Sequence, residues 1–167
     1  MSEGVDISVE ISSRLWWVMT TVWLLTGKLN AAASIGLSRR LTGWRRRRTT
    51  LSLGLAAGVA LILFAVVPLG PDTMTKGTLP LYLFGAFGSI IFGNALAITN
   101  GLSQHSLALP RWLATGSIAL GAIGLINIPA TYGWAPTGVA ESISVYSYIL
   151  WALLTGIVIA RTRRTTR

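Results

Sequence analysis

Residues 39–69 read RRLTGWRRRRTTLSLGLAAGVALILFAVVPL, six arginines in ten residues followed by a long uncharged apolar segment. An apolar segment of about 20 residues is long enough to cross the hydrocarbon core of a bilayer as a helix. Arginines clustered beside such a segment stay on the cytoplasmic side of the membrane. This stretch therefore predicts a membrane-spanning helix, and it also predicts the orientation of the chain that follows.

The same pattern recurs along the whole chain. Its 167 residues are 52% hydrophobic and only 11% charged, whereas a soluble domain carries about 25% charged residues. Four apolar runs have no Asp, Glu, Lys, Arg or His in their interior, and they leave too little polar sequence to cover them in water. The sequence therefore predicts an all-α integral membrane helical bundle. The four predicted transmembrane helices are 51–69, 79–99, 111–131 and 142–160.

These spans divide the chain into three regions. Residues 1–50 hold an acidic N-terminus, an amphipathic helix and an arginine-rich linker. Residues 51–160 form the four-helix transmembrane bundle, and residues 161–167 form a basic tail. Eleven arginines fall on the side of the linker and the tail, whereas the opposite loops hold one basic residue, Lys76. Because positively charged segments remain inside the cell, we expect the C-terminus to be cytoplasmic.

Residues 12–37 allow two interpretations. Their apolar residues fall on one helical face, which favours a helix lying in the plane of the membrane with its tryptophans at head-group depth. The alternative is a fifth span, which would place Lys28 near the middle of the bilayer at a cost of about 2.5–3.5 kcal/mol. The apolar face is formed by Ile11, Leu15, Val18, Met19, Val22, Leu25, Leu29 and Ala33, and the opposite face by Arg14, Thr20, Thr21, Gly27, Lys28 and Ser34.

Small residues recur at helical spacing in the predicted spans. In a bilayer, helices associate through close packing, and small side chains let their backbones approach. We expect these stripes to serve packing within the bundle. The alternative is that one of them, best represented by the second span, binds a partner subunit or a second copy of the chain. The small residues are Gly54, Gly58, Gly85, Ser89, Gly93, Ala97, Gly121, Ala152 and Gly156.

A few polar residues lie within or near the apolar segments. Asn94 lies in the inner third of the second span and Asn127 near the outer end of the third. We expect each amide to bond a neighbouring helix, since buried amides in membranes commonly find such partners. The alternative is a polar path for a neutral solute along Asn94, Asn127, Ser89 and Lys28. His105 is the only histidine, and it has neither a cysteine nor a nearby carboxylate to work with.

Several functional classes are disfavoured by what the sequence lacks. Cysteine is absent, which excludes thiolate metal sites and disulfides. Proton-coupled transporters and ion pumps need ionisable groups within the membrane, and the four spans carry none of Asp, Glu, Lys, Arg or His in their interior. We therefore expect no enzymatic activity, no cofactor and no bound metal.

The net charge of +9 comes from arginines beside apolar runs, without a zinc-finger or RNA-binding signature, so no nucleic-acid partner is expected. These arginines anchor the topology, and a second role in binding anionic lipid is the alternative. The residues concerned are Arg39, Arg40, Arg45, Arg46, Arg47 and Arg48.

The run from Gly93 to Leu96 and from Leu109 to Ala114, followed by a glycine-rich span, resembles segments of uncharacterised prokaryotic multi-pass membrane proteins. That resemblance carries no functional residues and implies only the cell membrane of a prokaryote. Together with the basic faces and the small-residue stripes, the sequence favours an accessory or assembly subunit of a larger membrane complex. The alternative is a small oligomeric channel or carrier for a neutral or hydrophobic solute. The partners expected are the lipid bilayer, with anionic lipid, and other membrane subunits or further copies of the chain.

Overall fold

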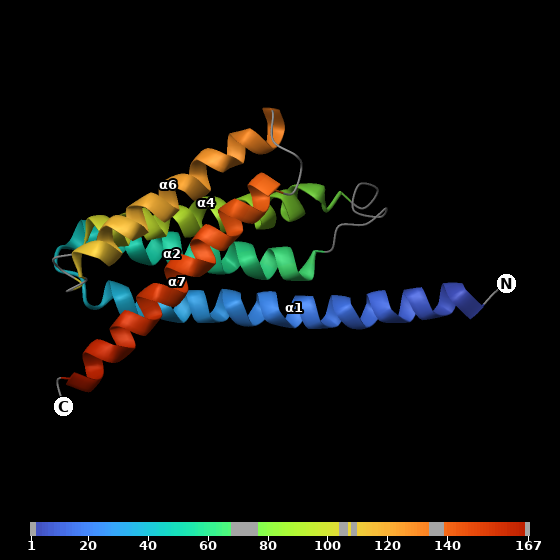
Figure 1. Cartoon of the computed structure of the whole chain (residues 1–167), viewed down its shortest axis with the longest axis horizontal. Helices are drawn as coiled ribbons and strands as arrows, with labels where there is room; N and C mark the ends of the chain where they lie inside the picture. Colours follow the sequence, from blue (N-terminus) through green and yellow to red (C-terminus); the bar gives the residue numbers. More distant parts are fainter. Residues whose placement is uncertain (1–2, 68–76, 104–106, 108–109, 134–138, 166–167) are drawn as a thin grey trace.

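The computed structural model describes residues 3–67, 77–103, 107, 110–133 and 139–165. The secondary structure within these ranges is helical, and four of the helices are long and apolar enough to cross a membrane. The chain is therefore an all-α membrane helical bundle, which confirms the predicted fold class. Its described helices are α1 (Glu3–Ser38), α2 (Trp44–Val66), α4 (Leu79–Leu102), α6 (Arg111–Gly133) and α7 (Val139–Thr165) (Figure 1).

The helices follow the apolar runs but extend beyond them. Helix α1 begins at Glu3, so it includes most of the acidic N-terminus. Helix α2 begins at Trp44, so that four arginines predicted to lie in a linker form its first turns. Arginine has a high helix propensity, and residues 45–50 include neither glycine nor proline. Gly43, with φ of 94°, ends the connection before it. The guanidinium of Arg48 lies 5.1 Å from the centre of the Trp44 ring, a cation–π contact within this first turn.

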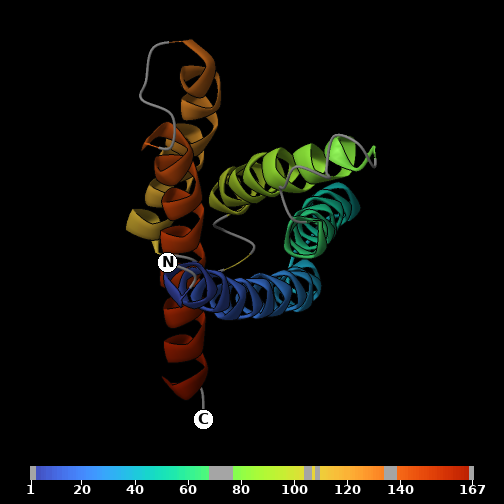
Figure 2. The same ribbon diagram turned by 90° about the vertical axis from the view of Figure 1, so that its right-hand side faces the viewer.

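The helices pack in chain order. α1 packs against α2, α2 against α4, α4 against both α6 and α7, and α6 against α7. In Figure 2, α1, α2 and α4 are seen nearly end on, whereas α6 and α7 stand upright in the picture, so the last two helices are inclined to the first three. One buried cluster joins α4 and α7 through Leu96, Ala97, Tyr148 and Trp151. A second, at the end of the bundle where the arginines lie, joins Leu37, Leu41, Leu107 and Leu113.

Helix α1 lies alongside α2 and runs antiparallel to it (Figure 1). The two backbones meet at glycines: a methyl group on Gly27 would lie 2.8 Å from the carbonyl oxygen of Gly58. The Trp23 ring packs edge-on against Phe64 at 5.6 Å, so this tryptophan contacts a neighbouring helix. A helix lying in the membrane plane would cross the spans instead of following one of them. This antiparallel packing is the one that a fifth span would adopt, and α1 is not among the four helices that are long and apolar enough to cross a membrane.

The two faces of α1 explain why its sequence allowed both interpretations. Small and polar residues, Thr20, Gly27 and Ser34, are buried against the bundle. The apolar residues point outward, with Met19 and Leu29 among those exposed. Lipid solvates apolar side chains, so a helix in a membrane bundle places small residues inside and large apolar residues outside. An in-plane helix would also present that apolar face to lipid, and the two cases share one sequence pattern.

Candidate functional site: a groove between helices α1 and α7

Two polar junctions hold the inclined helices to the others. At the first, Asn94 on α4 is fully buried, and its Nδ2 donates to the Ile90 carbonyl at 2.9 Å and to the Ser144 carbonyl on α7 at 3.2 Å. The Ser144 hydroxyl donates in turn to the Gly124 carbonyl on α6 at 2.8 Å. The Asn94 side chain thus bonds another helix, and three helices meet at one point.

The second junction links α7 to α1 and α2. The hydroxyl of Tyr148 donates to Oδ1 of Asn30, and Nδ2 of Asn30 donates to the Gly54 carbonyl at 3.2 Å. Neither Asn30 nor Tyr148 was singled out in the sequence. Asn30 could have been identified from its position in α1. It is an amide in a helix whose other small and polar residues face the neighbouring helix.

Between α1 and α7, on the arginine side of this junction, lies a cavity of about 580 Å³ that we call the α1/α7 groove. Helix α7 is inclined to α1, and both helices present small side chains where they diverge. Ala33 and Gly36 line the groove from α1, and Ala152 and Gly156 line it from α7. The predicted stripe of α7 therefore faces open space: among the described atoms, nothing lies within 4 Å of a methyl group placed on Gly156.

Three polar side chains that line the groove have a buried hydrogen-bonding atom without a partner in the described part of the chain. They are Ser34 Oγ, Trp151 Nε1 and Thr155 Oγ1. Their residues are 0%, 3% and 4% exposed, respectively. A buried polar group that makes no hydrogen bond costs about 1–3 kcal/mol. Most buried polar groups in proteins are bonded, so these three are exceptions. Each atom is closed off from the open space of the groove, and Ser34 Oγ lies against Gly54 on α2.

The other small-residue stripes lie against helices of the same chain. On α4, a methyl group on Gly85 would lie 2.6 Å from the backbone nitrogen of Phe64 on α2, and one on Gly93 would lie 2.9 Å from the Tyr148 ring on α7. Ser89 and Ala97 on the same stripe are also buried. The small-residue stripe of α4, which was the best candidate for binding a partner subunit, is thus enclosed by helices of the same chain. Gly54 and Gly58 face α1, and Gly121 faces the Asn94 carbonyl on α4.

The residues of the suggested polar path are not brought together. Asn127 is partly exposed on α6 and donates to the Ile123 carbonyl one turn earlier at 2.8 Å. Lys28 is exposed on α1, and Asn94 lies in the three-helix junction. Three cavities in the described part of the chain are lined by none of these three residues, and Ser89, the fourth residue of the path, lines one of them. His105 lies outside the described residues. Within them, no three His, Cys, Asp or Glu side chains gather as metal ligands would.

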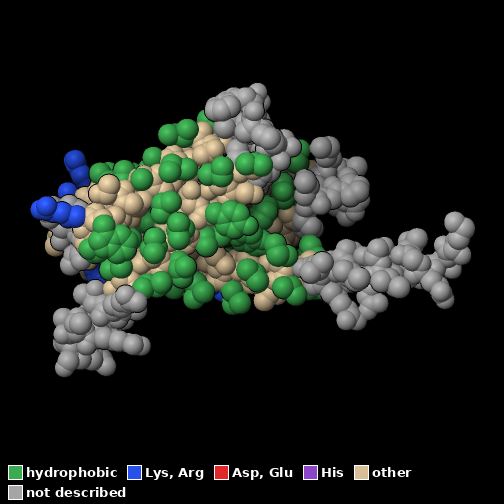
Figure 3. All heavy atoms as spheres, in the orientation of Figure 1, with side chains coloured by type: hydrophobic (Ala, Val, Ile, Leu, Met, Phe, Trp, Pro, Cys, Tyr) green, Lys and Arg blue, Asp and Glu red, His purple; other side chains and the backbone are tan. Residues whose placement is uncertain are grey.

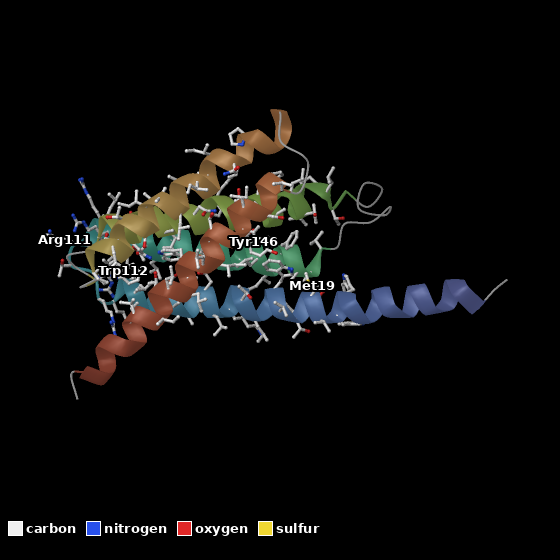
Figure 4. All side chains as sticks on the ribbon, in the orientation of Figure 1. Met19, Arg111, Trp112 and Tyr146 are labelled. Carbon is white, nitrogen blue, oxygen red and sulfur yellow. The ribbon has the colours of Figure 1, made fainter. Side chains whose placement is uncertain are left out.

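The arginines gather at one end of the bundle. In Figure 3, the basic side chains on the face shown lie mainly at that end, and apolar side chains cover the sides. Figure 4 places Arg111 and Trp112 at the same end, with Met19 and Tyr146 away from it. All six arginines of 39–48 are exposed. Arg40 is the one among them that lines the α1/α7 groove, at the end of the groove nearest the arginines.

Comparison with known proteins places the chain in a family. The family model described as "Protein of unknown function (DUF998)" matches residues 10–158. That match begins within α1 and ends within α7, so it includes α2, α4 and α6 and most of the other two described helices. Searches of curated proteins and of solved structures gave no significant match. Since the family model covers most of its length, the chain is a multi-pass membrane protein that belongs to the DUF998 family.

Proposed function

We propose that this protein is a non-catalytic subunit of a larger membrane complex in a prokaryotic cell membrane. In this proposal α1 crosses the bilayer as a fifth span, and the arginine end and the C-terminus face the cytoplasm. The observation that carries the proposal is Lys28, a cation exposed on the outer face of α1.

The depth of Lys28 is what makes it unusual. Its neighbour Gly27 packs against Gly58, in the middle of α2. Ten residues separate Lys28 from Ser38 at the end of α1, and a rise of 1.5 Å per residue makes this about 15 Å. That is half of a hydrocarbon core of about 30 Å. A lysine facing lipid at this depth costs about 2.5–3.5 kcal/mol.

A partner helix with a carboxylate at the same depth would remove this cost. Charged groups inside membranes usually pair with one another. The exposed apolar residues beside Lys28, Leu25 and Leu29, would pack against the same helix. The described face around Lys28 thus has both the charge and the apolar surface that a membrane-embedded acidic partner would recognise.

A second copy of this chain does not suit that role. Its five carboxylates lie at sequence positions near the ends of the helices or between them, and none lies in the interior of a span. A parallel copy would therefore bring no carboxylate to the depth of Lys28. The partner we propose is a different chain with Asp or Glu in a transmembrane helix. The carboxylates of this chain are Glu3, Asp6, Glu10, Asp72 and Glu141.

The channel or carrier alternative has less support. It relied on Asn94, Asn127 and Lys28 along one path, and these residues lie apart. Both amide hydrogens of Asn94 are used within the bundle. The non-catalytic role that we propose is supported by the composition of the four apolar spans, whose interiors contain no Asp, Glu, Lys, Arg or His.

The test is the mass of the native assembly, extracted gently with its lipids, for three forms of the protein. The wild type is expected to carry foreign subunits. Lys28→Leu is expected to lose them, and Lys28→Arg, which keeps the cation, is expected to retain at least part of them. A wild type that contains only copies of itself would overturn the proposal. So would foreign subunits that remain bound to Lys28→Leu at the wild-type level.

A further inference from the structure

The α1/α7 groove is long enough to receive part of another helix. On α1 its lining extends from Thr26 to Leu37, and on α7 it extends from Tyr148 to Ile159. Each stretch rises about 17 Å at 1.5 Å per residue. Each helix thus presents about three turns to the groove, which is enough for one face of a further helix.

The glycines of this groove differ from most helical glycines in the described part of the chain. A methyl group on Gly58 would lie 2.9 Å from a backbone atom of α1, and one on Gly85 would lie 2.6 Å from a backbone atom of α2. Gly36 and Gly156 are also inside helices, yet a methyl group on either meets no described atom within 4 Å, as at Gly116 on α6. Glycine weakens a helix relative to alanine, and in this bundle close packing accounts for most of its uses. A helix seated in the groove would account for Gly36 and Gly156 in the same way.

The small side chains distinguish a helix from a lipid chain as the occupant. Lipid solvates large and small apolar side chains alike, whereas another helix backbone approaches closely only over small ones. Both walls of the groove present exposed small residues, Ala33 and Gly36 on α1 and Ala152 and Gly156 on α7. A hydrocarbon chain has no need of small residues on two helices.

The charge beside the groove indicates the chemistry of that helix. Lys28 is exposed, and it directly precedes Leu29, which lines the groove. Ala32, one turn after Lys28, lines the groove as well. Charged residues that flank a contact between two helices pair with opposite charges on the partner. A carboxylate that meets Lys28 lies near the middle of the bilayer, a depth that lipid head groups do not reach.

We propose that the α1/α7 groove is the docking site of a transmembrane helix from a different chain, which packs against the small residues of both walls and pairs its Asp or Glu with Lys28. This inference rests on the proposed function, which supplies the acidic partner, and it adds the surface on which that partner lies. A second copy of the chain does not fit, because its carboxylates are not inside a span.

The test is photocrosslinking of the full chain in its own cell membrane, with benzoylphenylalanine at one of two adjacent positions of α7. Ile149 is 41% exposed and lines the groove, whereas Leu150 is 45% exposed and does not line it. We expect Ile149, and not Leu150, to attach to a transmembrane segment of a different chain that contains Asp or Glu. The segment is identified by mass spectrometry. Absence of a protein adduct at Ile149, attachment only to copies of this chain, a segment without a carboxylate, or equal attachment from both positions would overturn the inference.

A synthetic peptide of the crosslinked segment then measures whether the groove must be open. It is titrated against the full chain in phosphatidylcholine nanodiscs. Gly156→Leu fills the groove and is expected to weaken binding about tenfold. Gly116→Leu, which adds the same side chain outside the groove, is the control and should match the wild type. A peptide whose Asp or Glu is replaced by Asn or Gln should bind about 30-fold more weakly. Unchanged binding in either case would contradict the proposed docking site.

The native mass of the assembly separates failure of this inference from failure of the proposed function. Foreign subunits that are lost from Lys28→Leu but retained by Gly156→Leu would leave the proposed function standing and exclude the groove as the docking site. Absence of foreign subunits from the wild type would overturn both.

Discussion

The side chain of Asn94 on α4 occupies the space that any side chain at position 124 on α6 would need, since Gly124 packs directly against the Asn94 amide. The same amide donates to the Ser144 carbonyl on α7, and Ser144 donates to the Gly124 carbonyl. A glycine, a serine and an asparagine from three helices thus form one buried junction. Its strength should depend on the absence of a side chain at Gly124 as much as on the amide.

Gly124→Ala is the direct test of that junction. The added methyl group would overlap Asn94, whose position is fixed by two hydrogen bonds. Overpacking of a well-filled interior costs about 1–3 kcal/mol, so the variant should unfold at a lower temperature in a lipid-like detergent. Gly116→Ala is the control, because a methyl group there meets no described atom within 4 Å. Equal unfolding temperatures for both variants would show that α4 and α6 separate easily.

A double-mutant cycle would isolate the contact between the two residues. Asn94→Ala alone loses the bond to Ser144, worth about 0.6 kcal/mol for an average interhelical hydrogen bond in a membrane protein. In the Asn94→Ala background, Gly124→Ala should cost much less than in the wild type, because the overlapping amide is gone. Measured unfolding free energies that simply add would show that the two positions do not interact.

The sequence was sufficient for the spans because a bilayer imposes both their length and their composition. Most of each apolar run had to be helical, as the helix over 51–66 shows. The arginines were a poorer guide to the connections, because the four at 45–48 form the first turns of α2. The orientation of α1 could not be predicted, since Leu29 faces lipid in both interpretations. The groove could not be predicted either. The groove depends on the inclination of α7. The hydrogen bond at the end of the groove farthest from the arginines joins Tyr148 to Asn30, which are 118 residues apart in the sequence.

Tyr148→Phe should loosen α1 without changing the shape of the bundle. The variant loses the hydroxyl that donates to Asn30 and leaves that amide oxygen without its tyrosine partner. Loss of a buried partner costs about 1–3 kcal/mol. Faster hydrogen exchange in α1 near Asn30, with little change in α6, is the expected result. Tyr146→Phe is the matched control on the same helix, since Tyr146 is 68% exposed and Tyr148 is 7% exposed. Identical exchange in the two variants would contradict a role for the bond.

The fifth-span interpretation predicts on which side of the membrane the two ends of α1 lie. A cysteine at Gly4 should react with an impermeant thiol reagent from outside the cell, and a cysteine at Thr42 only after the membrane is opened. The native chain has no cysteine, so either label would be unambiguous. An in-plane helix would place both positions on the same side. Labelling of both from one side would therefore restore the in-plane interpretation and remove the basis for placing Lys28 at mid-bilayer.

The arginines of α2 should determine orientation through their charge, not through a specific contact. Arg45, Arg46 and Arg47 are exposed in the first turns of the helix, where the helix dipole is unfavourable to cations. Their presence there is explained by the tendency of basic segments to stay inside the cell. Replacing the four residues 45–48 with glutamine should give a mixed population of orientations, whereas four lysines should preserve the native one. The Thr42→Cys label measures both variants. If the glutamine variant keeps a single orientation, Arg39, Arg40 and the basic tail are sufficient, and the run at 45–48 has another role at the membrane surface.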